Sequence, residues 1–242
     1  MTISSVNADF NPIARAGMLI DPSPNYDDRE GPVSLLVMHY TGMPTGRAAI
    51  DLLKSPRAKV SSHYVVEEDG AVHCLVPEEK RAWHAGISYW RGRAMLNDAS
   101  IGIEIVNPGH SWGYRPFPAR QMQAVLELSQ GIIARHGIVA RNVVAHSDIA
   151  PNRKQDPGEL FPWSWLAARG VGVWTDAFAP SVDWQADLAA IGYDMTLPMP
   201  DVLLAFQRHF LPQNLTGAAD ARTKERAAAL RQLVVDEVPD ES

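Results

Sequence analysis

The chain has 242 residues, of which 46% are hydrophobic, so it can bury a full core and has room for one domain and a smaller second one. Its 28 acidic residues outnumber 22 basic ones, and the formal net charge of -6 argues against nucleic acid as the main partner. The single cysteine, Cys74, excludes an internal disulfide framework and is compatible with a reducing compartment.

The first thirty residues contain no continuous apolar segment of the length that a secretory signal needs. No run of 18 apolar residues indicates a membrane span. We therefore expect a cytoplasmic protein without a membrane span. If a signal segment has been removed from the sequence, a periplasmic or outer-membrane-anchored location is the alternative.

The first predicted strand is the apolar run 34–38, which leads directly into His39. Tyr40-Thr41-Gly42 then suit a strand that leaves the core for a loop. A short helix is predicted from Ala48 to Leu53. Alone, a histidine at the end of a buried strand is more often a hydrogen-bonded structural residue than a metal ligand.

A hairpin is predicted next, because Ser62–Glu67 and Val72–Val76 flank the turn residues Glu68-Asp69-Gly70. Its two histidines, His63 and His73, are expected to pack in the sheet or lie at the surface, without a metal role.

Glu104 lies in the strand pattern Ile101-Gly102-Ile103-Glu104-Ile105-Val106. Alternation along a strand places the three isoleucines on one face and Glu104 on the other. A glutamate inside a strand runs against β-propensity, which makes Glu104 a candidate functional residue. A carboxylate near an activated water can accept its proton and pass it to a leaving amine.

A long helix is predicted from Arg120 to Arg135, with Gly137 as its stop, and the apolar strand that follows ends at His146. Lys154 and Asp156 lie on the next loop. Catalytic zinc usually takes three protein ligands and leaves the fourth position to water, and His39, His146 and Asp156 supply three donors. Alternatively, Asp156 before Pro157-Gly158 is only a turn residue, and Lys154 is only a solvated charge.

Five segments, in this order and at about these intervals, carry a family resemblance: LLVMHYTG, SSHYVVEEDG, AWHAGISYWRG, LNDASIGIEIVN and VVAHSDIAPNRKQDPG. The chain resembles the zinc-dependent N-acetylmuramoyl-L-alanine amidases of the type 2 amidase family, whose fold is shared with peptidoglycan recognition proteins. The resemblance covers roughly residues 30 to 170.

The resemblance implies one zinc ion per chain, bound by His39, His146 and Asp156. It also implies that Glu104 transfers protons and that Lys154 stabilises the developing oxyanion, as preorganised positive groups generally do. Trp83 and His84 resemble a motif that lines the substrate groove. Asn97 is a further candidate for contact with the stem peptide.

Strands and helices alternate through the first 165 residues, which predicts an α/β fold with a mixed central sheet flanked by helices, and with ligands at strand ends and loops on one face. Residues 1–172 would form the catalytic domain and residues 173–181 a linker. Residues 182–242 would form a small three-helix domain that resembles a peptidoglycan-binding domain. A helical cap that only stabilises the enzyme is the competing interpretation. The predicted helices run from a cap at Ser181 to Ile191, from Pro200 to Phe210 and from Asp220 to Val235.

The expected function is hydrolysis of the amide between N-acetylmuramic, or 1,6-anhydro-N-acetylmuramic, acid and L-alanine in peptidoglycan recycling or turnover. Peptidoglycan fragments or anhydro-muropeptides are then the partners. Two alternatives stay open, a module that recognises muropeptides without cleavage and a zinc peptidase that acts within the stem peptide. The choice between polymeric and anhydro substrates, the stem-peptide preference, protein partners and the oligomeric state do not follow from the sequence.

Overall fold

A computed structural model describes residues 18–236 and has a six-stranded, mostly parallel sheet at its centre. The strand order is β1-β5-β4-β9-β3-β10, and β4 with β5 is the antiparallel pair. The strands are β1 (Leu19–Ile20), β3 (Leu35–Tyr40), β4 (Tyr64–Val66), β5 (Val72–Cys74), β9 (Ser100–Ile105) and β10 (Val143–Ala145). The predicted α/β fold with a mixed sheet is confirmed.

Two small antiparallel ribbons and several helices complete the described part of the chain. The ribbons pair β2 (Tyr26–Asp28) with β6 (Lys80–Ala82), and β7 (Tyr89–Trp90) with β8 (Arg93–Ala94). The α-helices are α2 (Gly46–Leu53), α3 (Gly109–Trp112), α4 (Ala119–His136), α5 (His146–Ile149), α6 (Trp163–Ala167), α7 (Trp184–Ile191), α8 (Met199–Phe210) and α9 (Ala221–Asp236). Short 3-10 helices span Leu96–Ala99 and Ala140–Asn142.

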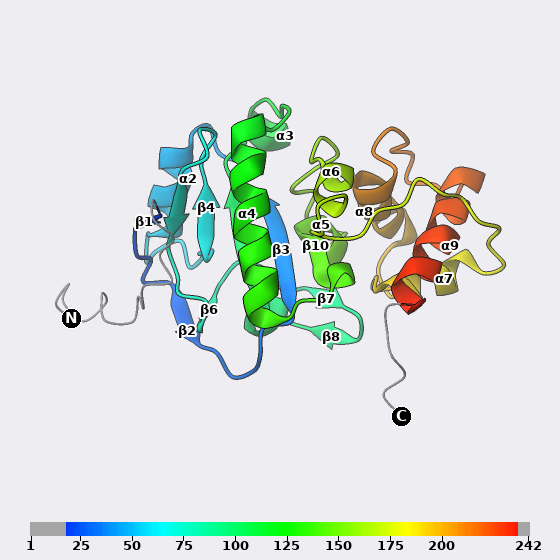
Figure 1. Cartoon of the computed structure of the whole chain (residues 1–242), viewed down its shortest axis with the longest axis horizontal. Coiled ribbons are helices and arrows are strands. Elements are labelled where there is room, and N and C mark those ends of the chain that lie inside the picture. Colours follow the sequence, from blue (N-terminus) through cyan, green and yellow to red (C-terminus); the bar gives the residue numbers. More distant parts are fainter. Residues whose placement is uncertain (1–17, 237–242) are drawn as a thin grey trace.

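One face of the sheet packs against α4, which crosses in front of β3 in Figure 1. Strand alternation accounts for the composition of this face. Leu36 and Met38 of β3 and all three isoleucines of β9 lie in the hydrophobic core beneath α4, whereas Glu104 is not part of this core. The helix ends at Gly137, whose φ of 63° is left-handed and whose N–H donates to the Ile133 carbonyl. The predicted stop at this glycine is confirmed.

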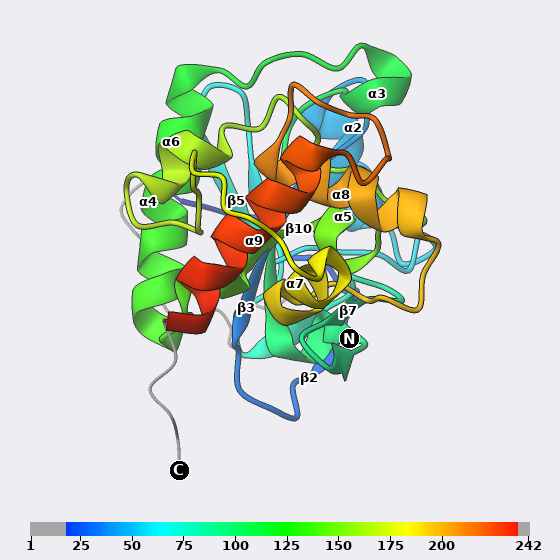
Figure 2. The same cartoon turned by 90° about the vertical axis from the view of Figure 1, so that its right-hand side faces the viewer.

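The opposite face of the sheet is covered in two parts. At one end, Ile50 and Leu53 of α2 pack against the β4 side of the sheet. At the other end, Leu35 and Val37 of β3 join a core whose remaining members come largely from the C-terminal helices. Figures 1 and 2 show these helices, α7, α8 and α9, gathered beside β10. The C-terminal helices therefore share a hydrophobic core with the sheet.

The start of α7 differs from the prediction. Asp183 is the N-cap, and its carboxylate accepts hydrogen bonds from the N–H groups of Gln185 and Ala186. Ser181, the predicted cap, donates its hydroxyl to Asp187 Oδ2 at 2.6 Å instead. Serine and aspartate are both favoured at N-caps, so the local sequence offered two candidates two residues apart.

The three predicted C-terminal helices are present, and their contacts extend beyond one another. Leu188, Phe206 and Phe210 pack in the same core as Val144 of β10. The division into domains at residues 172 and 182 stays a prediction. Among the helices of residues 18–236, none combines the length and apolarity needed to cross a bilayer. Residues 1–17, which carry part of the prediction about location, lie outside the described residues.

Candidate metal centre

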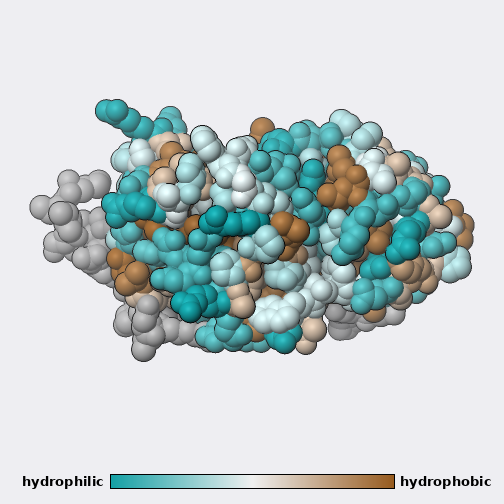
Figure 3. All heavy atoms as spheres, turned by 90° about the horizontal axis from the view of Figure 1, so that it is seen from above, coloured by the Kyte–Doolittle hydropathy of each residue, from teal (hydrophilic) through white to brown (hydrophobic). Residues whose placement is uncertain are grey.

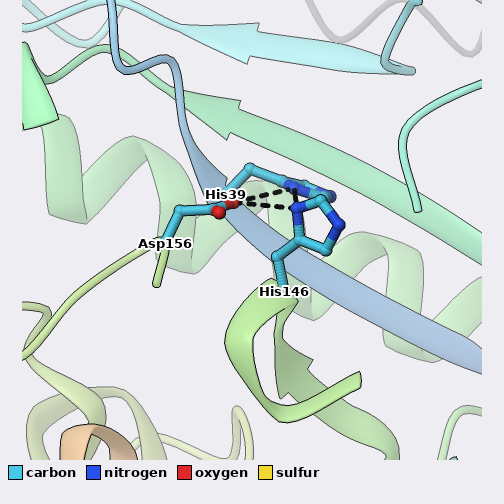
Figure 4. Close-up of side chains that lie close together, drawn as sticks. All are labelled: His39, His146 and Asp156. Atoms are coloured by element: carbon cyan, nitrogen blue, oxygen red, sulfur yellow. Dashed lines mark hydrogen bonds and ion pairs between the residues drawn. The ribbon is translucent and has the colours of Figure 1, made fainter. Parts of the chain in front are cut away.

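His39, His146 and Asp156 meet at the edge of the sheet where the parallel strands end. His39 is near the end of β3, and His146 begins α5 directly after β10. β3 and β10 are parallel neighbours in which Met38 pairs with Ala145. The residues that follow this pair, His39 and His146, are the two ligand candidates. Asp156 returns on the following loop, where its carbonyl accepts the Ser147 N–H at 3.0 Å. Figure 4 shows the three side chains pointing toward one another.

Three donor atoms of these residues form a tight triangle. His39 Nδ1 lies 2.9 Å from His146 Nδ1 and 3.1 Å from Asp156 Oδ2, and His146 Nδ1 lies 3.0 Å from the same oxygen. Donors bound tetrahedrally to a metal at about 2.1 Å are about 3.4 Å apart, so a small outward movement would fit an ion. All three residues are buried, and within the described residues they form the one such donor cluster.

The outer ring nitrogen of each histidine has a partner, as in metal sites whose ligands are held by further hydrogen bonds. His146 Nε2 donates to the Ala85 carbonyl at 3.2 Å. His39 Nε2 lies 3.0 Å from His84 Nδ1, and His84 Nε2 lies 3.1 Å from the Ser100 hydroxyl. One set of tautomers satisfies these contacts, with Nε2–H directed outward and the Nδ1 lone pairs of His39 and His146 directed at the shared point.

The electrostatics favour the metal-binding protonation states. Burial, followed by the neighbouring His146, lowers the pKa of His39 to about 4, so its imidazole is neutral at neutral pH. Burial opposes ionisation of Asp156, but His146 and His39 outweigh it and hold the pKa of this carboxyl well below its usual range. A neutral imidazole and an ionised carboxylate are the forms that coordinate metals, so His39 and Asp156 fit a metal ion.

Glu104 lies beside this cluster because it pairs with His39 in the register of β9 and β3. It lines a cavity of about 350 Å³ that Lys154 and two of the three clustered residues, His146 and Asp156, also line. Its Oε2 atom is buried without a hydrogen-bond partner among the described residues. Burial, followed by the Asp156 charge, raises the Glu104 pKa well above its ordinary value, and Lys154 acts in the opposite direction. A carboxyl group with a raised pKa on the cavity wall can exchange a proton with a ligand there.

Of the three predicted substrate-binding residues, two lie on the cavity wall and one does not. Trp83 and His84 line the cavity, whereas Asn97 is not part of its wall. Asn97 Oδ1 accepts the N–H groups of His84 and Ala85, so Asn97 holds the segment that carries the cavity residues. The His84 ring also lies against Gly102, where an added Cβ would come within 2.6 Å of it. The substrate roles of these residues stay predictions.

Several cavity residues were not anticipated from the sequence. Tyr40 and Gln155 line the cavity. Each is adjacent in sequence to a proposed ligand, and this adjacency could have indicated a position at the site. Arg153 also lines it and donates to the carbonyls of Ala85 and Ile87 at 2.6 and 3.0 Å. These contacts join residues more than sixty positions apart, and no local pattern indicates them.

The sequence and fold match known amidases. The family model described as N-acetylmuramoyl-L-alanine amidase matches residues 29–159, which is more than half of the chain. N-acetylmuramoyl-L-alanine amidase AmiD of Escherichia coli (strain K12) is 42% identical over 229 residues, covering 82% of this chain and 82% of AmiD. The 1,6-anhydro-N-acetylmuramyl-L-alanine amidase AmpD of the same strain is 38% identical over 163 residues, covering 59% of this chain and 86% of AmpD.

Solved structures agree with the sequence matches. A complex of AmiD from E. coli with the substrate anhydro-N-acetylmuramic acid-L-Ala-D-gamma-Glu-L-Lys is similar with a TM-score of 0.74 and 38% identity, covering 86% of this chain and 98% of AmiD. AmpDh3 from Pseudomonas aeruginosa in complex with anhydromuramic pentapeptide is similar with a TM-score of 0.75 and 33% identity, covering 84% and 92% of the two chains. The protein belongs to the N-acetylmuramoyl-L-alanine amidase family.

Proposed function

We propose that this protein is a zinc-dependent amidase that cleaves the bond between N-acetylmuramic, or 1,6-anhydro-N-acetylmuramic, acid and L-alanine of peptidoglycan stem peptides. The convergence of His39, His146 and Asp156 beside the unpartnered carboxylate oxygen of Glu104 carries this proposal. The substrate class is supported by AmiD and AmpDh3, whose solved complexes contain anhydro-muropeptides.

In this mechanism His39, His146 and Asp156 would hold the zinc ion. When bound, the zinc ion would supply Lewis acidity to the site. Glu104 accepts a proton from the water and delivers it to the departing nitrogen of L-alanine. Lys154, on the cavity wall two residues before Asp156, stabilises the oxyanion that forms on the carbonyl oxygen. The products are the lactyl carboxylate of the sugar and a peptide with a free L-alanine amine.

The surroundings of the site suit a polar substrate. Figure 3 looks onto the end of the molecule that carries α3 and the ends of the parallel strands, and hydrophilic residues predominate there, with hydrophobic residues in small separate patches. Trp83 adds an aromatic surface on the cavity wall, and its Nε1–H donates to Asp27 at 2.7 Å. We infer that the sugar and the stem peptide contact this wall.

The C-terminal helices have two candidate roles, glycan binding and stabilisation of the catalytic part. We propose stabilisation, because apolar residues of α7, α8 and α9 pack in one core with β3 and β10. Residues 1–172 and 182–242 would then be two regions around a common core, joined by the linker 173–181.

The test is to incubate the zinc-loaded protein with a purified muramyl tetrapeptide and with its 1,6-anhydro form, and to identify the products by mass spectrometry. Metal-dependent release of the intact tetrapeptide that begins with L-alanine supports the amidase, and a chelated sample is the control. The ratio of the two rates distinguishes recycled fragments from wall material as the preferred substrate.

Two other results would contradict the proposal. Products cut within the stem peptide would identify a zinc peptidase. Zinc binding with no cleavage of either substrate would identify a recognition module.

A further inference from the structure

Asp148 is a buried carboxylate that lies in α5, two residues after His146. Its Oδ2 accepts the Ala145 N–H at 2.8 Å and lies 2.7 Å from His209 Nδ1. Its Oδ1 accepts the Tyr193 hydroxyl at 2.7 Å. Both carboxylate oxygens of Asp148 therefore have hydrogen-bond partners. Two of the three donors, Tyr193 and His209, come from the C-terminal region, residues 182–236.

The two C-terminal donors are held rigidly. The His209 ring on α8 stacks on Trp163 and on Phe210, with ring centroids 3.8 Å apart in each case. Tyr193 follows α7, and its ring packs edge-on against Trp90. His209 and Tyr193 are each 2% exposed, so water does not compete for these hydrogen bonds.

The helix that carries Asp148 depends on such contacts for its geometry. α5 has four residues, and one turn is too short to be stable alone. Ala145, at its N-cap position, has no side-chain oxygen that can cap the helix. The Asp148 carboxylate binds the Ala145 N–H instead and so holds the backbone on both sides of His146.

We propose that Asp148 is a positioning residue that sets the orientation of His146, and that the C-terminal region acts on the metal centre through Tyr193 and His209. The hydrophobic core that the C-terminal helices share with the sheet contributes to overall stability. The hydrogen bonds to Asp148 add a specific function, because they hold the backbone from which the His146 side chain projects. Residues that orient a metal ligand typically change metal affinity by about 10- to 100-fold when they are lost.

The experiment measures zinc affinity by competition with a chelator, and the melting temperature of the metal-free protein, for a set of single variants. Tyr193→Phe removes the hydroxyl that bonds Asp148 and keeps the ring. His209→Phe keeps a stacked ring and removes the donor, whereas His209→Asn keeps an N–H near the position of Nδ1 and removes the ring. Thr223→Val is the matched control, because it removes a buried hydroxyl that accepts a hydrogen bond from Gln207 and none from the partners of Asp148.

We expect Tyr193→Phe and His209→Phe to bind zinc roughly 10-fold or more weakly than the unchanged protein. Thr223→Val should keep its zinc affinity within about twofold while its melting temperature falls, since it loses a hydrogen bond to Gln207 and leaves those to Asp148 intact. His209→Asn should also lower the melting temperature but keep most of the zinc affinity.

Equal zinc affinity in all variants, with melting temperatures lowered as in Thr223→Val, would overturn the proposal and leave these contacts a purely structural role. If His209→Phe does not fold, Tyr193→Phe decides, since it removes a single oxygen atom. Failure of the unchanged protein to bind zinc would overturn the metal centre itself, and with it this inference. Zinc binding by the unchanged protein without amide cleavage would leave the inference standing and contradict only the proposed activity.

Discussion

Glu104 carries a carboxylate within the central strand β9 and also lines the cavity. Carboxylates are depleted in strands. Its strand neighbours Ile103 and Ile105 are buried against α4, and alternation directs the glutamate to the other face, beside His39. A buried oxygen without a hydrogen-bond partner is costly unless it serves a ligand. This cost, beside three residues that could hold a metal ion, is a physical argument for a role in proton transfer.

Replacement of this carboxylate separates proton transfer from metal binding. Glu104→Gln keeps the size of the side chain but cannot accept a proton, and we expect turnover to fall by about 10² to 10⁴-fold with zinc still bound. Steady-state kinetics and metal analysis of the purified variant check both parts. His146→Ala is the comparison, because it should lose zinc and activity together. Near-normal turnover by Glu104→Gln would contradict the assigned role.

Among the contacts between secondary-structure elements, Glu78 connects the last turn of α4 to the sheet through hydrogen bonds. Its carboxylate binds Arg135 and His136 of α4 and accepts the Tyr64 hydroxyl of β4 at 2.6 Å. Burial opposes ionisation, but the hydrogen bonds, led by that of Arg135, lower the Glu78 pKa to about 2. The ionised carboxylate therefore stabilises the packing of α4 on the sheet.

The pH dependence of stability follows from the sign of this shift. A carboxyl with a lowered pKa in the folded state contributes stability that is complete above its unfolded pKa of 4.5 and is lost as the pH falls toward 2. Because the Glu78 pKa falls from 4.5 to about 2 on folding, Glu78→Gln should lower the free energy of unfolding at pH 7 by up to roughly 3 kcal/mol. Urea unfolding at pH 7 and at pH 3 checks this prediction. A loss that is as large at pH 3 as at pH 7 would show that the charge is not responsible.

At the scale of the whole molecule, the C-terminal helices complete the second face of the sheet. Phe206 of α8 is fully buried in the core that also contains Leu35 and Val37 of β3. Removing such a side chain leaves a cavity that the surroundings fill only in part. The effect should therefore reach the catalytic part of the chain.

We expect Phe206→Ala to lower the free energy of unfolding by about 3 to 5 kcal/mol and to shift one cooperative transition of the whole chain. Calorimetry, with near-ultraviolet circular dichroism as a second probe, measures the number of transitions. Leu233→Ala, at an exposed position of α9, is the control and should have little effect. Two separate transitions, with only one moved by Phe206→Ala, would show that residues 182–242 fold as an independent unit.

Features that depend on neighbours along the chain could be predicted from the residues alone. Strand alternation predicted the outward side of Glu104, Gly137 marked the end of α4, and the apolar strands ending in His39 and His146 indicated the site. The hydrogen bonds of His84 to His39, and of Tyr193 and His209 to Asp148, became visible only in the folded chain. These contacts join residues 45 to 61 positions apart, and the packing of whole elements, which sets them, leaves no periodic signal in the chain.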